Sequence, residues 1–230
     1  MTGRPYVLLS CAMSIDGYID DATTERLLLS NADDLDRIDG VRAGCDAILV
    51  GAGTVRRDDP RLLVRSDRRR AERVARGLPP SPAKVTLTAS GDLDPTSRFF
   101  TMGDATKLVY CPSGASEKTR ERLGGVATVV DAGEPASPAA VLADLAARGV
   151  RRLMVEGGGS VHAQFLSAGL ADELHLVVAP FFVGDGRAPR FVGDGRFPWH
   201  SGRRARVLDV RQIGDVVLTR YALSDRCEGG

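Results

Sequence analysis

The stretch Ala47-Ile48-Leu49-Val50-Gly51-Ala52-Gly53-Thr54-Val55-Arg56-Arg57-Asp58-Asp59-Pro60-Arg61 changes abruptly from apolar to polar along its length. Its first four residues predict a strand that is buried on both faces. The glycines that follow expose the backbone, so that a ligand can approach it closely. Thr54, Asp58 and Asp59 then supply a hydroxyl and two carboxylates within a few residues. Because open α/β sheets bind ligands at such strand ends, this stretch is a candidate site.

A structural interpretation of the same stretch stays open. A single Gly-x-Gly without the third glycine of the dinucleotide fingerprint also fits a tight strand-to-helix turn followed by solvated charges. The decision between the two therefore depends on the rest of the chain.

Outward from this stretch, apolar strand patterns alternate with helical ones. Strands are expected at 5–13, 47–50, 84–88, 107–111, 126–130, 152–156 and 173–179. Helices are expected after Ser30, which is the expected N-cap, at 116–123 and 137–148, and from about 161. Such alternation predicts mostly parallel strands with helices on both faces. Residues 205–213 and 216–223 flank Gly214-Asp215 and predict a C-terminal antiparallel hairpin. The sequence thus indicates an α/β fold with a mixed sheet.

Composition sets limits on the class of protein. The 230 residues are 43% hydrophobic and 27% charged, with a formal net charge of +1. We expect a single domain over 1–230, with a core at 5–223 and a basic, proline-rich decorated loop at 66–82. The near-zero charge provides no global field for nucleic acid. No apolar run is long enough to span a bilayer and no signal peptide is evident, which favours a cytoplasmic protein without a membrane partner.

Neither cysteines nor histidines form a recognisable metal or redox motif. The four cysteines are far apart, and Cys11 and Cys45 lie in or beside apolar runs, which predicts buried reduced thiols. His162, His175 and His200 are scattered, and each is interpreted as structural. We therefore expect no metal site.

A second glycine-rich strand end occurs at Glu156-Gly157-Gly158-Gly159-Ser160. Consecutive glycines at a helix N-terminus present backbone amides to an anion such as a pyrophosphate. Two such ends in one sheet can hold the two halves of a dinucleotide, which favours a nucleotide site. No Gly-Lys-Ser/Thr follows either end, so ATP hydrolysis is disfavoured. Hydride transfer fits, since the cofactor itself performs that chemistry.

Arginines and one acidic turn complete the candidate residues. Arg42, Arg61 and Arg65 could grip a phosphate, although a surface ion pair is the alternative for each. The arginine-rich run from Ser66 to Gly77 is interpreted as a solvated surface helix or loop. Asp16-Gly17 follows the first strand, and a simple turn is an open alternative to a polar role for Asp16.

In combination these residues resemble the pyrimidine reductases of riboflavin biosynthesis, which share a dihydrofolate-reductase-like fold. The resemblance runs from about Tyr6 to Leu223. It is carried by Ala12-Met13-Ser14-Ile15-Asp16-Gly17, by residues 42–55 with Asp58-Asp59-Pro60-Arg61-Leu62, by Val155-Glu156-Gly157-Gly158-Gly159-Ser160, by residues 169–174 and by Ala179-Pro180. It implies a three-layer α/β sandwich and a homodimeric NAD(P)H-dependent oxidoreductase. The family uses NADPH to deliver hydride to the sugar C1 of a phosphoribosylamino pyrimidine, which becomes ribitylamino.

The resemblance also implies roles for individual residues. The cofactor-binding residues would be Ala12, Gly51, Gly53, Thr54, Asp58, Ser90, Gly157, Gly158, Gly159, Ser160, Val161 and Gln164. The substrate-binding residues would be Arg42, Arg61, Leu62, Arg65 and Glu156, with the arginines near the phosphate. Asp58 and Glu156 are the candidates for a polar catalytic role.

Three features depart from the bifunctional members of this family. The chain begins directly with the reductase sequence, without their zinc deaminase. Ser10 stands where they have a lysine, which resembles the free-standing archaeal and fungal reductases that act before deamination. Asp92 stands after Ser90, where an arginine for the cofactor 2′-phosphate would be expected, so NADH is an alternative to NADPH.

Two rival functions stay open. One is a reductase of the same fold that acts on another carbonyl or imine in folate-like or specialised metabolism, with the segments 20–29 and 180–200 as the deciding loops. The other is a nucleotide-binding protein without catalysis.

Overall fold

The computed structural model describes residues 3–23, 25 and 27–227, and these fall into two units. The first unit contains residues 3–5 and Asp39–Met154, and the second contains Tyr6–Ile38 and residues 155–227. Helix α1 (Ala32–Ala43) and strand β6 (Arg152–Gly157) each have residues in both units. The loop at 20–29 includes positions 24 and 26, which lie outside the described residues.

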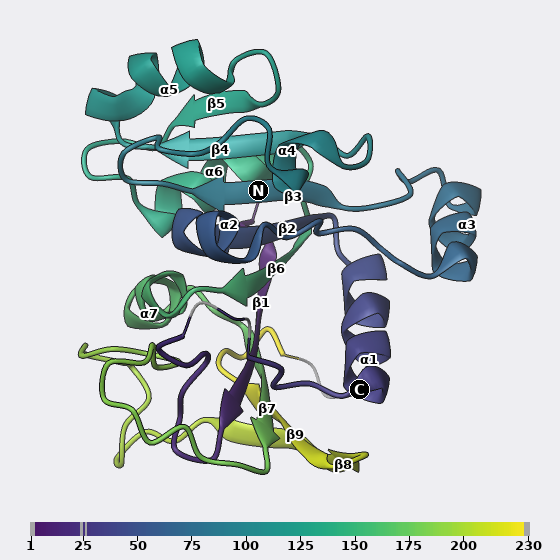
Figure 1. Cartoon of the computed structure of the whole chain (residues 1–230), viewed down its shortest axis with the longest axis vertical. Coiled ribbons are helices and arrows are strands. Elements are labelled where there is room, and N and C mark those ends of the chain that lie inside the picture. Colours follow the sequence, from purple (N-terminus) through teal and green to yellow (C-terminus); the bar gives the residue numbers. More distant parts are fainter. Residues whose placement is uncertain (1–2, 24, 26, 228–230) are drawn as a thin grey trace. The chain divides into compact units, whose positions relative to one another are not determined.

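The first unit is organised around parallel strands. They are β2 (Ala47–Gly51), β3 (Ala83–Leu87), β4 (Lys107–Cys111) and β5 (Thr128–Asp131), and they lie side by side in the order β5-β4-β3-β2 (Figure 1). Strand β2 is buried at every position, as its apolar run predicts. The first unit also contains the helices α2 (Ala52–Asp58), α3 (Asp67–Ala75), α4 (Arg98–Thr101), α5 (Ser116–Leu123) and α6 (Pro138–Ala147), and the short 3-10 helix η1 (Ser113–Ala115).

The core of this unit is made by apolar side chains from β2 and β4, from α2, α4 and α5, and from the connecting segments. Its buried members are Ile48, Val50, Ala52, Val55, Leu62, Leu93, Phe99, Phe100, Val109 and Leu123. Burying side chains of this size contributes about 1.5–3 kcal/mol each relative to exposure. Strands β2 and β3 pair in parallel, so their carboxyl ends lie next to one another.

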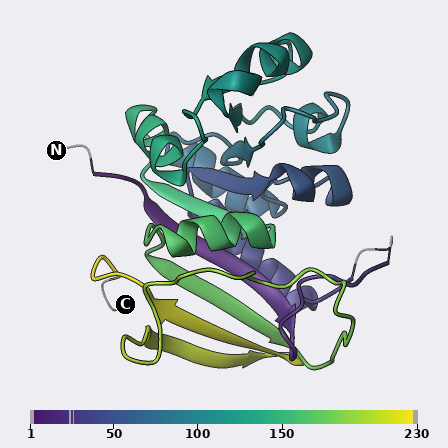
Figure 2. The same cartoon turned by 90° about the vertical axis from the view of Figure 1, so that its left-hand side faces the viewer.

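The second unit combines parallel and antiparallel pairing (Figure 2). Strand β1 (Tyr6–Ser14) pairs in parallel with β7 (Glu173–Ala179). Strands β9 (Val216–Ala222) and β8 (Arg206–Ile213) extend the sheet in antiparallel fashion, in the order β1-β7-β9-β8. Helix α7 (Gly159–Ser167) follows β6.

The α/β class, the mostly parallel strands and the antiparallel C-terminal hairpin are confirmed. One boundary residue is corrected: Ser30 was expected to cap α1, but the side chain of Asn31 accepts the amide of Asp34 at 2.9 Å. Both residue types cap helices well, so the pattern alone does not choose between neighbours. The four cysteines are reduced and buried, as expected for Cys11 and Cys45. The single-domain assignment stays a prediction.

None of the helices in the described residues combines the length and the apolar character that a membrane span requires.

Candidate functional site

In the first unit, the candidate residues that follow β2 and β3 lie at one sheet edge. The parallel register pairs Gly51 with Leu87, so the turn after β2 and the loop after β3 are neighbours. Gly51 is buried and caps α2, and Thr54 is half-buried in its first turn. A Cβ added at Gly53 would have no heavy atom within 4 Å. This edge therefore presents backbone and a hydroxyl with open space beside them, which fits close approach of a nucleotide.

The loop after β3 has a fixed shape. The Thr88 hydroxyl accepts the amide of Gly91 at 3.1 Å, and Gly91 has a positive φ of +70°. A Cβ at Gly91 would lie 2.0 Å from the Thr119 hydroxyl, so only glycine fits. Ser90 is exposed on this loop, and its hydroxyl accepts the amide of Asp92 at 3.3 Å. Ser90 is thus held at the same edge as the turn after β2.

Two cations compensate the acid that follows Ser90. Arg122 lies 3.0 Å from the Asp92 carboxylate, and Arg56 donates to the Asp92 carbonyl at 2.9 Å. The negative charge that Asp92 brings to this loop is therefore offset locally. The ion pair between Arg122 and Asp92 could not be predicted from sequence spacing, because Arg122 lies on α5, thirty residues after Asp92.

The two carboxylates at the end of α2 have different surroundings. Asp59 has a left-handed backbone (φ 40°) and accepts the amide of Arg98 at 2.5 Å and its Nε at 2.9 Å. Asp59 thus anchors the start of α4. The half-buried Asp58 is the other acid of the pair. A cavity of ≈ 370 Å³ beside this turn is lined by Val55, Arg56, Asp59, Asp94, Thr96 and Ser97.

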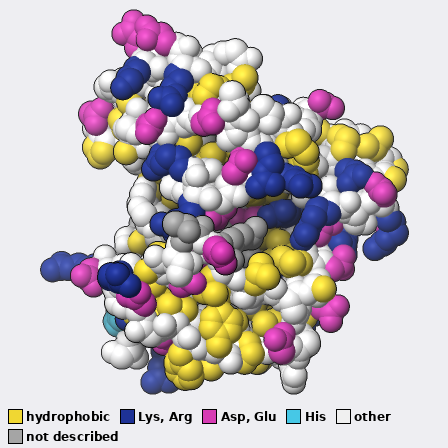
Figure 3. Space-filling view, in the orientation of Figure 1, with side chains coloured by type: hydrophobic (Ala, Val, Ile, Leu, Met, Phe, Trp, Pro, Cys, Tyr) yellow, Lys and Arg dark blue, Asp and Glu magenta, His cyan; other side chains and the backbone are white. Residues whose placement is uncertain are grey.

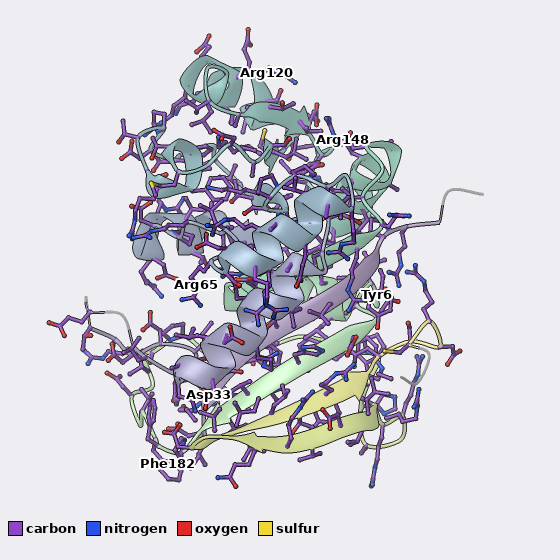
Figure 4. The ribbon with its side chains drawn as sticks, turned by 90° about the vertical axis from the view of Figure 1, so that its right-hand side faces the viewer. Tyr6, Asp33, Arg65, Arg120, Arg148 and Phe182 are labelled. Carbon is purple, nitrogen blue, oxygen red and sulfur yellow. The ribbon has the colours of Figure 1, made fainter. Side chains whose placement is uncertain are left out.

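The candidate substrate residues of this unit lie on the segment 61–66 and at the end of α1. Arg61 and Arg65 are exposed, and Arg65 (labelled in Figure 4) precedes α3 in the chain. Arg42 is half-buried and its Nη1 lies 3.4 Å from the Leu63 carbonyl. The side chain of Leu62 is 2% exposed and belongs to the core, so only its backbone is available to a ligand.

In the second unit, Ala12 is half-buried near the end of β1, where a network fixes the following turn. The Asp16 carboxylate accepts the Ser14 hydroxyl at 2.6 Å and the amides of Val183 and Gly184 at 3.1 and 2.8 Å. Burial opposes its ionisation, but these donors outweigh burial and lower the pKa of Asp16 to about 2. Asp16 therefore has a structural role, namely holding the loop after β7.

The glycine-rich end of β6 leads into α7. Glu156 is half-buried, and Gly157 and Gly158 have φ values of 147° and 43°, with Gly158 at the N-cap. A Cβ at Gly159 would lie 2.5 Å from the carbonyl oxygen of Arg190. Glycine is thus required where the segment around Arg190 crosses the first turn of α7.

The remaining candidates of this group lie along α7. Ser160 is exposed, and its hydroxyl accepts a hydrogen bond from the side-chain Nε2 of Gln164 at 3.4 Å, whereas the side chain of Val161 is buried. First-turn amides of an α-helix lack an i−4 partner and can bind an anionic group. In α7 the amide of Val161 already donates to the Gly158 carbonyl at 2.9 Å, so the amides of Gly159 and Ser160 are the candidates for this role.

Two of the histidines, His162 and His175, are buried in structural surroundings, whereas His200 is exposed. His162 is fully buried on α7, which lowers the pKa of its ring to about 4, and its nitrogens have no hydrogen-bond partner. His175 Nε2 lies 2.8 Å from Glu173, which also accepts from Arg220 at 2.6 Å and from Tyr6 (labelled in Figure 4) at 2.9 Å. Burial lowers the pKa of His175. Within the described ranges, no cluster of three His, Cys, Asp or Glu side chains could hold a metal ion.

Comparison with known proteins finds a matching family profile and similar reductases. The sequence profile described as the RibD C-terminal domain matches residues 5–219. The chain is 38% identical over 181 residues to the 2,5-diamino-6-ribosylamino-4(3H)-pyrimidinone 5′-phosphate reductase of Archaeoglobus fulgidus, covering 79% of this chain and 83% of that protein. It is 34% identical to the protein of the same name from Methanothermobacter thermautotrophicus, covering 79% and 80%.

Solved structures show the same fold. Acinetobacter baumannii RibD superposes with a TM-score of 0.78 at 24% identity, covering 96% of this chain. The chain spans 58% of that longer protein. The riboflavin biosynthesis reductase Rib7 of Saccharomyces cerevisiae gives a TM-score of 0.69 at 18% identity, covering 96% of this chain and 90% of the yeast protein.

Proposed function

This chain belongs to the RibD C-terminal domain family, and we propose that it is a pyrimidine reductase of riboflavin biosynthesis. The reaction is the NADPH-dependent reduction of the ribosyl group of a phosphoribosylamino pyrimidine to a ribitylamino group. The observation that carries the proposal is the 38% identity, over most of both chains, to a reductase with this substrate in its name. The glycine-rich and polar strand ends described above support it chemically.

We propose the diamino pyrimidine, before deamination, as the substrate. The two archaeal relatives are named for that compound, and Ser10 stands where the bifunctional enzymes are expected to have a lysine. The deaminated compound is the alternative substrate for the same site.

We propose NADPH-binding residues for each unit taken by itself. In the first unit they are Gly51, Gly53, Thr54, Asp58 and Ser90, and in the second Ala12, Gly157, Gly158, Gly159, Ser160, Val161 and Gln164. The open space at Gly53 and the first-turn amides of α7 fit a dinucleotide. Bound NADPH would supply the hydride, and the protein would supply orientation and polar groups.

We propose NADPH rather than NADH because Arg122 and Arg56 offset the charge of Asp92 beside Ser90. The ratio of kcat/KM for NADPH to that for NADH measures the preference. An Arg122→Ala variant is expected to lower this ratio, since Asp92 then repels the 2′-phosphate. An unchanged ratio contradicts the assignment.

The substrate residues are Arg42, Arg61, Leu62 through its backbone, Arg65 and Glu156. The arginines would bind the phosphate, since a guanidinium matches its oxygens bidentately. Asp58 in the first unit and Glu156 in the second are each proposed for a polar role, toward a ribosyl hydroxyl or toward the proton that accompanies the hydride. Asp59 takes no part, because Arg98 engages its carboxylate.

One assay tests the function. The protein is mixed with NADPH and the ribosylamino pyrimidine phosphate, in its amino or its deaminated form, and the nicotinamide absorbance is followed. Oxidation with the amino form supports the proposal, and oxidation only with the deaminated form reverses the assigned order of steps. Tight NADPH binding without oxidation of either would favour the non-catalytic alternative. Oxidation only with other carbonyl or imine compounds would favour the second reductase function.

We further propose a homodimer formed through an apolar face of the second unit. Strand register places Leu176, Val178, Val207, Val210 and Val217 on the same face of β7, β9 and β8. The last three are 54%, 60% and 42% exposed, and β8 is an edge strand. Exposed apolar faces and unpaired edges of this kind are suited to association with a second copy.

Light scattering after size exclusion tests this interface. Val210→Asp is expected to give monomers, since it puts a charge in the apolar face. Val74→Asp on α3, where Val74 is 54% exposed, is the matched control and should keep the wild-type mass. A dimer that survives Val210→Asp would exclude this face.

A further inference from the structure

A buried carboxylate in the second half of α1 holds the backbone of the segment before α3. Asp39 is 2% exposed. Its Oδ1 accepts the amide of Arg65 at 2.5 Å, and its Oδ2 accepts the amide of Ser66 at 3.1 Å and Nη1 of Arg69 at 3.0 Å. Burial would raise the pKa of Asp39, but these donors outweigh it and the pKa is lowered. An ionised Asp39 thus fixes two consecutive backbone amides.

The opposite side of the same segment is held as well. Arg70 donates to the carbonyls of Val64 at 3.0 Å and Arg65 at 2.7 Å, and it also pairs with Asp67. The amide of Val64 donates to the Ser81 hydroxyl at 3.0 Å. Both backbone polar groups of Val64 and of Arg65 are therefore engaged by surrounding side chains.

The helix that supplies these arginines is itself locked to the end of α1. Arg73 is 2% exposed and donates to the carbonyls of Ala43, Cys45 and Pro79, each at 2.8 Å. Basic side chains gather over α3 on the surface (Figure 3). Arg69, Arg70 and Arg73, however, are used as internal clamps and are not merely solvated.

Such fixation has an energetic reason. Leu62 adopts a positive φ of 45°, which is unfavourable for a residue with a side chain, so the segment needs outside contacts to persist. The side chain that this fixed backbone projects is Arg65, which we have assigned to the substrate phosphate. A bidentate contact between guanidinium and phosphate is sensitive to small displacements of the backbone that carries it.

We propose that Asp39 is a positioning residue for phosphate recognition: it fixes the amides of Arg65 and Ser66 and so holds the Arg65 guanidinium where the phosphate binds. Asp39 itself touches no substrate in this scheme. This inference rests on the proposed function in one respect, namely that the substrate carries a phosphate that Arg65 binds. Its test therefore includes measurements that need no turnover.

The kinetic test is a double-mutant cycle with Asp39→Asn, Arg65→Ala and the double variant. Asparagine keeps the shape of Asp39 but loses the charge and places an NH₂ against one of the donors. Asp39→Asn is expected to raise the KM for the phosphorylated substrate about tenfold, the equivalent of one charge-assisted hydrogen bond. The KM for NADPH should change less than about twofold. In the Arg65→Ala background, Asp39→Asn should add less than about twofold, because it acts through Arg65.

Matched controls come from an exposed ion pair on α3. Arg68 and Glu72 lie 2.8 Å apart with side chains 74% and 52% exposed. Arg68→Ala and Glu72→Gln should leave both KM values unchanged. Arg70→Ala, which loosens the carbonyl side of the clamp at a partly exposed residue, should reproduce the selective rise in KM at smaller size and serves if Asp39→Asn does not fold.

Two measurements are independent of activity. Hydrogen exchange at the amides of Arg65 and Ser66 should become faster in Asp39→Asn. The affinity for inorganic phosphate, followed by NMR titration, should fall in Asp39→Asn and in Arg65→Ala alike. If no pyrimidine is reduced, the proposed function fails, while these two measurements still decide the role of Asp39.

Three results would overturn the inference. The first is an equal rise in both KM values. The second is a full Asp39→Asn effect in the Arg65→Ala background. The third is phosphate affinity that either substitution leaves unchanged.

Discussion

Replacing the buried His162 by leucine should reduce the loss of stability of this protein between pH 7 and pH 5. His162 is 0% exposed on α7, its ring centroid lies 5.3 Å from that of Phe191, and neither ring nitrogen has a hydrogen-bond partner. Burial disfavours the charged ring and lowers its pKa from 6.5 to about 4. Protonation therefore favours the unfolded chain, where the ring regains its ordinary pKa.

The sign and size follow from proton linkage. Between pH 6.5 and pH 4 the unfolded chain binds this proton and the folded chain does not, so stability falls as the pH falls through that window. With a folded pKa of about 4, His162 destabilises the folded state by about 0.2 kcal/mol at pH 7 and about 2 kcal/mol at pH 5. For a chain of this length, a difference of that size corresponds to about 4–8 °C in Tm.

The assay is thermal unfolding of wild type and His162→Leu at pH 7 and at pH 5. We expect the Tm of the wild type to fall by about 4–8 °C more than that of the variant over this interval. His200→Leu, at an exposed histidine, is the control and should behave as wild type. Parallel losses in wild type and His162→Leu would show that the ring is hydrated or paired in the folded protein, and the reasoning would be refuted.

Three further substitutions have defined outcomes. Arg65→Ala should raise the KM for the phosphorylated substrate at least about tenfold and leave that for NADPH unchanged, with Arg68→Ala as control; equal effects on both would remove Arg65 from the phosphate site. Gly159→Ala should weaken NADPH binding measured by fluorescence titration, because its Cβ would lie 2.5 Å from a backbone oxygen and α7 must shift; unchanged affinity would separate the start of α7 from the cofactor. Gly91→Ala should lower the Tm, since its Cβ would lie 2.0 Å from the Thr119 hydroxyl and φ is +70°; an unchanged Tm would mean that the loop adapts at no cost.

The strands were predictable from the sequence because their burial leaves a direct mark on composition. Residues 47–50 form a buried strand because continuous apolar runs have no other satisfactory placement, and Gly214-Asp215 does turn the C-terminal hairpin. The choice of cap at α1 was not predictable, because Ser30 and Asn31 are adjacent residues with similar capping strength.

The arginine-rich run shows why the rest was not predictable. A run of charged residues with few apolar neighbours predicts a solvated surface helix or loop, and in the structure it contains the helix α3, with exposed residues such as Arg68. Arg73 is nevertheless buried, since a long side chain can reach carbonyl oxygens that are distant in sequence. Which arginine of α3 is buried depends on where the carbonyls of Ala43 and Cys45 lie in space. The local sequence pattern does not contain that information.

The same reasoning separates residues that identify the family from residues that perform chemistry. Asp16 belongs to a motif that carries the family resemblance, yet its carboxylate is engaged by Ser14 and by two amides of the loop after β7. Asp39 belongs to no motif, yet its carboxylate fixes the backbone that projects Arg65. A residue of a family motif can be required by the fold, by the reaction, or by both. The contacts of each carboxylate, rather than its place in a motif, therefore decide which substitution should change substrate affinity and which should only loosen a loop.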